Sequence, residues 1–312
     1  MISFKNLGNF GNLGNQLFQY AFLRTAARRL GVKFYCPRWI GDDIFTLNDS
    51  EERAENLENI SSQYVEPNNY LGFNPSTLRI EDGTDILGYF QTQQYWDPQS
   101  IREWYTFRQD RIDRVSIKYK DIDFYRSVGM HLRFGDKRSS IDCRVLFYNP
   151  RPQYYKRALS CIKPEKNVIV FSDEIGVAKD YLQPVKNNFI FVDGNEPYED
   201  LFLMTWCCDL ILSASTFCWW GALLNSHCGN IIAPSEGALR PGYWVKNYDY
   251  ICESWIKIKA LRWFVDDYYI TLLKELFRHP RETMPVISRK ISWALSFCKS
   301  FLIARKGKVR IK

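Results

Sequence analysis

The sequence lacks the residue patterns of several common kinds of protein. Its nine cysteines are an odd number and form neither a Cys-x-x-Cys pair nor a repeated spacing. No run of apolar residues reaches the roughly 20 that are needed to span a bilayer, and no signal peptide precedes the first motif. We therefore expect free thiols in a reducing compartment, without a disulfide framework, and a cytoplasmic protein.

Metal and hydrolase motifs are also missing. With three well-separated histidines, the chain has no His-Glu-x-x-His and no Cys/His cluster of ligand spacing, so we expect no metal site. An Asp-x-Asp triplet at 121–123 resembles a motif that can hold a metal ion. We discount it, because such triplets are frequent by chance and this one lies in a charged loop. No Gly-x-Ser-x-Gly elbow is present, which argues against a serine hydrolase.

The chain does have apolar residues in abundance and an uneven distribution of charge. Its 312 residues are 46% hydrophobic and 16% aromatic, enough for the cores of two domains. The net charge is +7, but the segment 278–312 alone carries ten Lys and Arg against one acidic residue, Glu282. The rest is close to neutral, so we expect no nucleic-acid partner for the folded part, and only a basic arm would support that alternative.

From residue 127 onward, short apolar strands alternate with helical segments, which is the pattern of parallel βαβ units. We expect an α/β fold with a first domain over 1–126, a second over 127–260 and a basic helical tail over 261–312. In the tail, apolar residues between Ile287 and Leu302 share one helical stripe. This pattern predicts peripheral contact with anionic lipid, on the inner face of the plasma membrane, or alternatively packing on the first domain.

Three glycines open the chain in the stretch GNFGNLGNQLFQY, at positions 8, 11 and 14. Their Gly-x-x-Gly-x-x-Gly spacing differs from the dinucleotide fingerprint Gly-x-Gly-x-x-Gly. A helix follows, with Gly31 as its stop. Asn15 and Gln16 offer amides beside the start of this helix, a suitable place for an anion or a sugar, although a simple helix-capping loop is the alternative.

The stretch HLRFGD is the strongest candidate for anion binding. His131 and Arg133 point to one face of a strand, and the following turn carries Asp136. An imidazole beside a guanidinium at a strand end can clamp a phosphate. The alternative is a structural Arg–Asp pair beside a buried histidine.

Two further strand ends carry polar residues. Ser172 and Asp173 follow the buried strand NVIVF, and Ser215 and Thr216 follow DLILS, where the next helix begins. Ligands of open α/β sheets gather at such ends. Helix N-capping is the competing explanation for these side chains.

These motifs, taken in order, resemble the α-1,2-fucosyltransferases of glycosyltransferase family 11. The similarity rests on GNLGNQLFQYAF, GYFQTQQYW, HLRFGD, YYKRAL, FSDE and LFLMTWCCDLILSASTFCWWGALLN. It implies a GT-B fold, in which two Rossmann-like domains face each other across a cleft. It also implies an inverting transfer of L-fucose from GDP-L-fucose to the 2-hydroxyl of a galactoside, with no essential metal or other cofactor. The reaction would belong to O-antigen or capsule assembly. Its acceptor would be a galactose-containing oligosaccharide, and a lipid-linked oligosaccharide is one such acceptor.

The resemblance also assigns roles to individual residues. It implies that His131 and Arg133 hold the diphosphate. The general base is a separate question, and proximity to Arg133 makes Asp136 one candidate, with orientation of Arg133 as its other role. A carboxylate of the first domain is the alternative base. Donor contacts would come from Gly14, Asn15, Gln16, Ser172, Asp173, Ser215, Thr216 and Phe217.

Two positions depart from the family pattern. The chain has Phe134 where a second Arg is usual, and Ala214 where Asn is common. A related GDP-deoxyhexose such as GDP-colitose is therefore an alternative donor. A non-catalytic sugar-nucleotide- or carbohydrate-binding relative is the other alternative.

Overall fold

The computed structural model describes residues 1–67, 70–163, 166–240, 246–247, 249–261 and 268–288. The chain divides into two compact units. The first consists of Met1–Phe134, Asn149–Leu239 and Trp244–Leu261, and the second of Gly135–Tyr148, Arg240–Tyr243 and Arg262–Lys312. These units divide the chain differently from the three predicted domains, whose limits stay a prediction.

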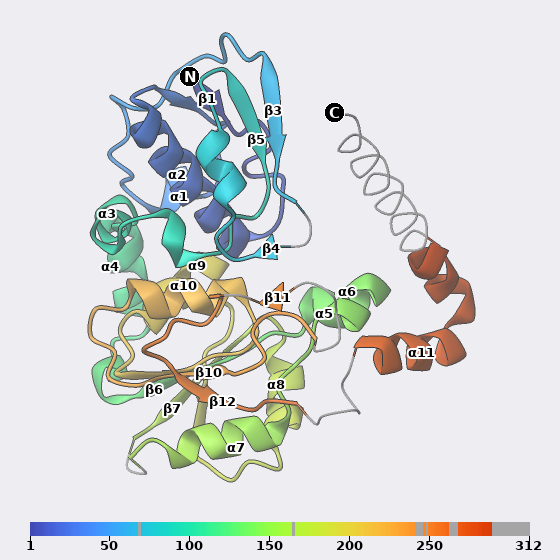
Figure 1. The fold of residues 1–312 in the computed structure, drawn as a ribbon. Helices are drawn as coiled ribbons and strands as arrows, with labels where there is room; N and C mark the ends of the chain where they lie inside the picture. Colours follow the sequence, from blue (N-terminus) through green and yellow to red (C-terminus); the bar gives the residue numbers. More distant parts are fainter. Residues whose placement is uncertain (68–69, 164–165, 241–245, 248, 262–267, 289–312) are drawn as a thin grey trace. The chain divides into compact units, whose positions relative to one another are not determined.

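The first unit contains two larger sheets, and all of their strands are parallel (Figure 1). The first sheet has the order β2-β1-β5-β3, with β1 (Ile2–Ser3), β2 (Phe34–Tyr35), β3 (Ser62–Val65) and β5 (Thr84–Leu87). A small parallel pair joins β4 (Tyr70–Leu71) to β11 (Lys246–Asn247). The helices of this half are α1 (Leu13–Leu30), α2 (Gly41–Ile44), α3 (Pro98–Trp104) and α4 (Gln109–Lys118), with 3₁₀ turns at Pro75–Arg79, Gln93–Tyr95 and Phe124–Arg126.

The second sheet has six strands in the order β12-β10-β9-β6-β7-β8. They are β6 (Val128–Leu132), β7 (Val168–Ser172), β8 (Phe189–Phe191), β9 (Asp209–Ile211), β10 (Ile231–Pro234) and β12 (Ile256–Ile258). Its helices are α7 (Pro152–Ser160), α8 (Ile175–Leu182), α9 (Pro197–Met204) and α10 (Thr216–Leu224). Counted along the chain, this is the doubly wound order 3-2-1-4-5-6 of Rossmann folds, and the order reverses between β6 and β9.

Helix α1 follows β1 and packs between the first sheet and α10. It ends at Gly31, whose φ of +66° and backbone N–H bonds to the carbonyls of Ala27 and Arg28 close the last turn, as the sequence predicts. One side of α1 lies on the first sheet and the other on α10. Phe18 contacts Trp219 and Trp220, with ring centroids 4.8 Å apart in both pairs. Both tryptophans are buried, as expected for core residues.

The second unit is helical and contains α5 (Gly135–Ser139), α6 (Ile141–Leu146) and α11 (Tyr268–Arg278). Helix α11 packs on α6. The apolar stripe predicted between Ile287 and Leu302 lies almost wholly outside the described residues. The predicted α/β class with two Rossmann-like sheets, the GT-B arrangement, is confirmed by these sheets and their helices.

Candidate functional site

The neighbouring strands β6 and β9, between which the strand order reverses, carry four of the predicted residues at or just after their carboxyl ends: His131, Arg133, Ser215 and Thr216. Ligands of doubly wound sheets bind outside this point of reversal. His131, only 4% exposed, lies one residue from the end of β6, and its Nδ1 is 2.8 Å from Oγ of Ser213, which follows β9. The hydrogen bond fixes the orientation of the imidazole ring between the two strand ends.

Arg133 follows β6 and forms an ion pair with Asp173, which follows β7. The distance from Nη1 of Arg133 to Oδ2 of Asp173 is 3.0 Å. The other carboxylate oxygen, Oδ1, accepts the backbone N–H of Phe134 at 2.9 Å. Asp173 therefore orients the guanidinium of Arg133 and the turn that follows it. From the sequence, this orienting role was predicted for Asp136. Ser172 accepts the backbone N–H of Glu174, a local turn contact.

Ser215 caps α10, because its hydroxyl accepts the backbone N–H of Phe217 at 3.3 Å. This confirms the capping alternative for Ser215, and it fixes the positive end of the α10 dipole beside β6 and β9. The Phe217 ring lies 5.5 Å from the ring of His131. The imidazole is thus held on one side by Ser213 and on another by an aromatic face.

The glycine loop contacts this same helix start. A Cβ at position 14 would be only 2.6–2.7 Å from atoms of Thr216 and Phe217, so Gly14 is required for this close approach. The indole Nε1–H of Trp220 donates to the carbonyl of Gly14 at 2.9 Å. Oδ1 of Asn15 accepts from the hydroxyl of Thr216 at 3.1 Å. Gly14 and Asn15 therefore bring the first sheet's loop to the polar end of α10.

Gln16 faces its own loop. Its Nε2 donates to the carbonyls of Gly8 and Gly11 at 3.2 and 2.9 Å, and its side chain is buried. The residue holds the loop in shape, and its amide donor is occupied by those two carbonyls.

The two departures from the family pattern are buried. Phe134 is 2% exposed, and its ring lies 5.2 Å from that of Tyr181. Ala214 is 3% exposed, directly after Ser213. An apolar ring thus occupies the position at which a second arginine is usual.

Asp136 belongs to the second compact unit, where it lies in the first turn of α5. Its predicted role beside Arg133 stays a prediction.

Two polar residues that follow strands of the first sheet were not predicted from the sequence. Gln91 donates from Nε2 to Oδ1 of Asn15 at 2.9 Å. Glu66, directly after β3, accepts the backbone N–H groups of Tyr89 and Phe90 at 2.7 and 3.0 Å and so holds the loop that carries Gln91. Phe90 has a φ of +52°, an uncommon value for a bulky residue. Gln91 lay inside the motif GYFQTQQYW, whereas no sequence signal marked Glu66.

Burial raises the pKa of Glu66 to about 7, against the effect of the two N–H bonds. Because the folded state favours the protonated form, the contribution of Glu66 to the free energy of unfolding should be largest below about pH 4.5, the ordinary pKa of the group. This contribution should fall by roughly 3 kcal/mol as the pH rises to about 7. Urea unfolding of Glu66→Gln across this range should give a flatter profile than the unsubstituted chain.

Asp200 gives a second, independent test of the same effect, because burial raises its pKa to about 7 as well. Asp200→Asn should flatten the same part of the profile, and the double variant should flatten it further. A profile that Glu66→Gln leaves unchanged would contradict the buried, protonated state of Glu66.

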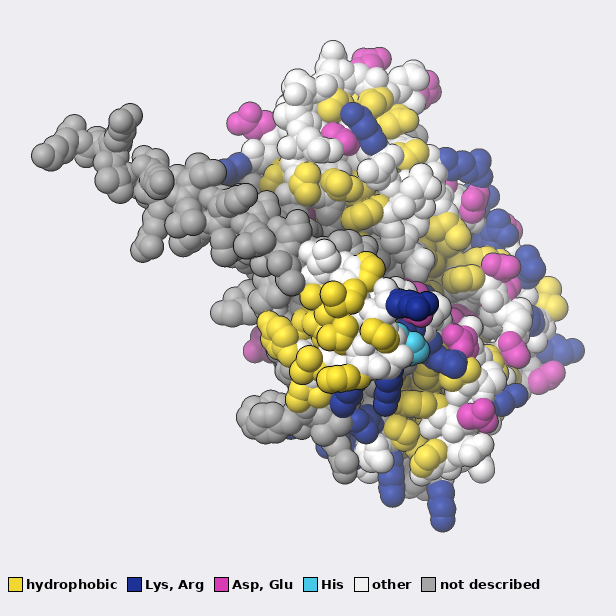
Figure 2. Space-filling view, turned by 90° about the vertical axis from the view of Figure 1, so that its right-hand side faces the viewer, with side chains coloured by type: hydrophobic (Ala, Val, Ile, Leu, Met, Phe, Trp, Pro, Cys, Tyr) yellow, Lys and Arg dark blue, Asp and Glu magenta, His cyan; other side chains and the backbone are white. Residues whose placement is uncertain are grey.

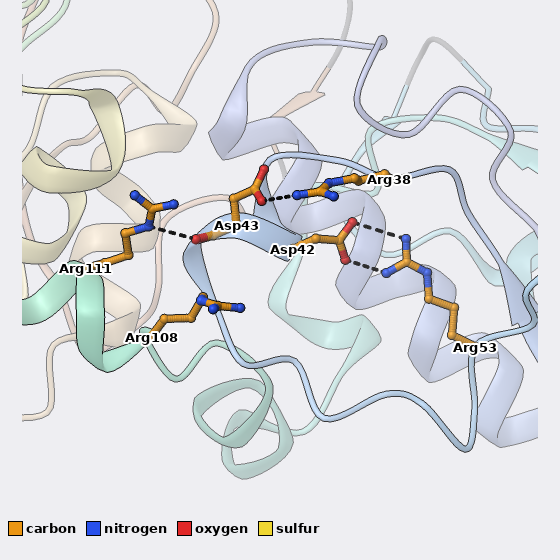
Figure 3. A pocket seen from close by; sticks show the side chains of 6 residues that line it. All are labelled: Arg38, Asp42, Asp43, Arg53, Arg108 and Arg111. Carbon is orange, nitrogen blue, oxygen red and sulfur yellow. Dashed lines mark hydrogen bonds and ion pairs between the residues drawn. The ribbon is translucent and has the colours of Figure 1, made fainter.

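A separate pocket of about 470 Å³ lies near α2 and the start of α4 (Figure 3). Arg53 binds both carboxylate oxygens of Asp42, and Arg38 pairs with Asp43. Nε of Arg111 donates to the backbone carbonyl of Asp43 at 3.1 Å. These pairs hold the loop around α2 in place, and none of the predicted site residues lines the pocket, which is bordered by Arg38, Asp42, Asp43, Arg53, Arg108 and Arg111.

The described residues contain no group of three or more His, Cys, Asp or Glu side chains that could hold a metal ion. Among the helices in these ranges, none combines the length and the apolar character that crossing a membrane requires.

The sequence and the fold were compared with known proteins. A family model described as Glycosyl transferase family 11 matches residues 87–258. The alpha-1,2-colitosyltransferase of Escherichia coli is 25% identical, covering 80% of this chain and 97% of that protein. The O-antigen biosynthesis glycosyltransferase WbnK of Escherichia coli is 26% identical, covering 71% and 90%. The crystal structure of the fucosyltransferase NodZ from Bradyrhizobium is similar with a TM-score of 0.48 at 12% identity, covering 74% and 93%.

Proposed function

The chain belongs to glycosyl transferase family 11, and from this premise we propose that it transfers a 6-deoxyhexose from a GDP-sugar to a galactoside acceptor. The observation that carries the proposal is the position of His131, Arg133 and the capped start of α10. All three lie at the carboxyl ends of β6 and β9, where a doubly wound sheet binds its ligand.

The reaction needs positive charge at this place. Transfer passes through an oxocarbenium-like state while negative charge grows on the departing GDP. In our proposal, Arg133, His131 and the α10 helix start stabilise that charge, so no metal or other cofactor is required. Asp173 keeps the guanidinium in position through the 3.0 Å ion pair.

The first sheet's loop would complete the donor site. Thr216 and Asn15 are hydrogen-bonded to each other, so both can approach the same diphosphate or sugar. In our proposal, the base that deprotonates the acceptor hydroxyl is Asp136 or a carboxylate of the first domain. Gln16, whose Nε2 is occupied within the loop, would act on the donor only through the loop's shape.

The sugar is L-fucose or colitose. The motif resemblance favours L-fucose, moved with inversion to the 2-hydroxyl of galactose. The buried Phe134 and Ala214, which replace two polar residues, favour a donor with one hydroxyl fewer. A relative that is 25% identical over most of its length is named a colitosyltransferase, in line with this second donor. The relative named for O-antigen biosynthesis supports an oligosaccharide acceptor of that kind, including a lipid-linked one, at the cytoplasmic side of the membrane.

The full chain should form product from GDP-L-fucose or GDP-colitose with a β-galactoside, and EDTA should leave the rate unchanged. Mass spectrometry of the product measures both donors in parallel. The matched control is the 2-deoxygalactoside, which lacks the accepting hydroxyl and should give no product. GDP binding without turnover of either donor would instead support the non-catalytic alternative.

A further inference from the structure

Helix α11 exposes a row of large apolar side chains. Tyr269, Leu273 and Phe277 are 55%, 53% and 85% exposed and lie four residues apart, hence along one face. Its acidic residue Glu275 is only 9% exposed and accepts from Nε of Arg144 in α6 at 3.2 Å. The inner face of the helix therefore holds this ion pair together with the buried Tyr268, while the outer face exposes large apolar groups.

The chain continues this surface beyond α11. Met284, seven residues after Phe277, is 55% exposed. Exposed basic residues flank the apolar ones: Lys274, Arg278 and Arg281. Figure 2 shows a patch of hydrophobic side chains on the face that it presents. Large apolar groups clustered in this way mark an interaction surface.

We propose that this α11 face, consisting of Tyr269, Leu273, Phe277 and Met284 with the basic residues around it, lies on an anionic lipid surface. Charge complementarity selects this occupant. The segment 278–312 carries ten Lys and Arg against Glu282 alone, whereas the remainder of the chain is near neutral. Apolar side chains that enter the lipid boundary beside basic groups that contact anionic headgroups are the pattern of interfacial helices.

The two kinds of side chain have separable contributions. The basic residues bring the helix to the surface, and their effect falls as salt is added. The apolar residues hold it there, because each buries area that is otherwise exposed to water. The proposal concerns binding alone and does not depend on the identity of the transferred sugar.

The test is co-sedimentation of the full chain with vesicles of phosphatidylcholine, with and without phosphatidylglycerol. The unsubstituted protein should bind the phosphatidylglycerol vesicles and dissociate as salt rises. The variant Leu273→Ser/Phe277→Ser should bind them about tenfold or more weakly, because two large apolar side chains no longer enter the lipid.

Leu78→Ser/Ile117→Ser is the matched control, since these residues are 59% and 75% exposed in the first unit. It should bind vesicles like the unsubstituted protein, and circular dichroism should show both variants folded. Equal binding by the α11 variant, or no binding by the unsubstituted chain, would overturn the proposal. A dimer in light scattering that the α11 variant abolishes, without vesicle binding, would overturn it in favour of a second copy on this face.

Discussion

Arg133→Ala is expected to lower kcat by about a hundredfold or more while the protein stays folded. A preorganised cation aimed at developing charge is typically worth about 3–4 kcal/mol in the transition state. Arg133 is fixed for this task by its ion pair with Asp173, 3.0 Å away, at the end of β6. Its side chain is 25% exposed, so its removal leaves no cavity in the core. The measurement is kcat and KM for the donor, with the unfolding midpoint as a check on folding.

Arg111→Ala is the matched control for this experiment. Arg111 has a similar exposure, 33%, and is also held by polar contacts, but it lines the separate pocket near α2. Its loss should leave kcat within about twofold, as expected for a residue outside the charge-stabilising set. Arg133→Lys should recover part of the lost activity, because it restores the charge without the planar guanidinium. Activity of Arg133→Ala near that of the unsubstituted chain would refute the assignment of the site.

Arg24→Met is expected to have the largest effect on stability, a loss of about 3–5 kcal/mol. Arg24 lies in α1 and is 1% exposed, with its guanidinium 4.5 Å from the Trp104 ring. It donates to the carbonyls of Leu47 and Asn48 at 2.6 and 2.9 Å. Both of these residues have positive φ values, 52° and 50°, so the guanidinium maintains an unusual backbone turn. Methionine fills similar space but leaves buried carbonyls without donors.

Arg28→Ala is the control, because it shares the partner Glu52 but is 46% exposed. We expect it to cost under about 1 kcal/mol, the usual range for an exposed ion pair. Burial raises the pKa of Glu52, yet hydrogen bonds from Arg28 and Arg24 hold it at about 2. Urea unfolding at neutral pH compares the variants, with Arg24→Lys added in case Arg24→Met fails to fold. Equal losses for Arg24→Lys and Arg28→Ala would show that burial adds nothing to the role of Arg24.

Local sequence signals carried the prediction of the second sheet. The apolar runs of β6 and β7 are buried on both faces, so their composition alone identified them as inner parallel strands. The polar residues after each strand were correctly placed at strand ends for the same reason. The family resemblance read from the ordered motifs is confirmed by the match over residues 87–258.

Contacts between segments that are distant in the sequence could not be predicted from such local signals. Asn15 and Thr216 are hydrogen-bonded across 201 positions of the chain, and no periodicity in either segment encodes the pairing. The partner of Arg133 was also missed, because Asp173 becomes its neighbour only once β6 and β7 pair. Arg24 was unexpected in the core for a related reason: α1 packs between the first sheet and α10, so its polar side is buried too.

The hydrogen bonds of Asn15 limit what its side chain can recognise. Oδ1 already accepts from Gln91 and Thr216, so both of its lone pairs are used. In the proposed donor site, the Asn15 amide can therefore bind a ligand only through Nδ2, as a hydrogen-bond donor. It would select for oxygen atoms, those of a phosphate or a sugar hydroxyl, and discriminate against N–H groups. An aspartate there would keep Gln91 and Thr216 in place, but it would repel an anionic ligand, so the asparagine combines polarity selection with neutrality in a single side chain.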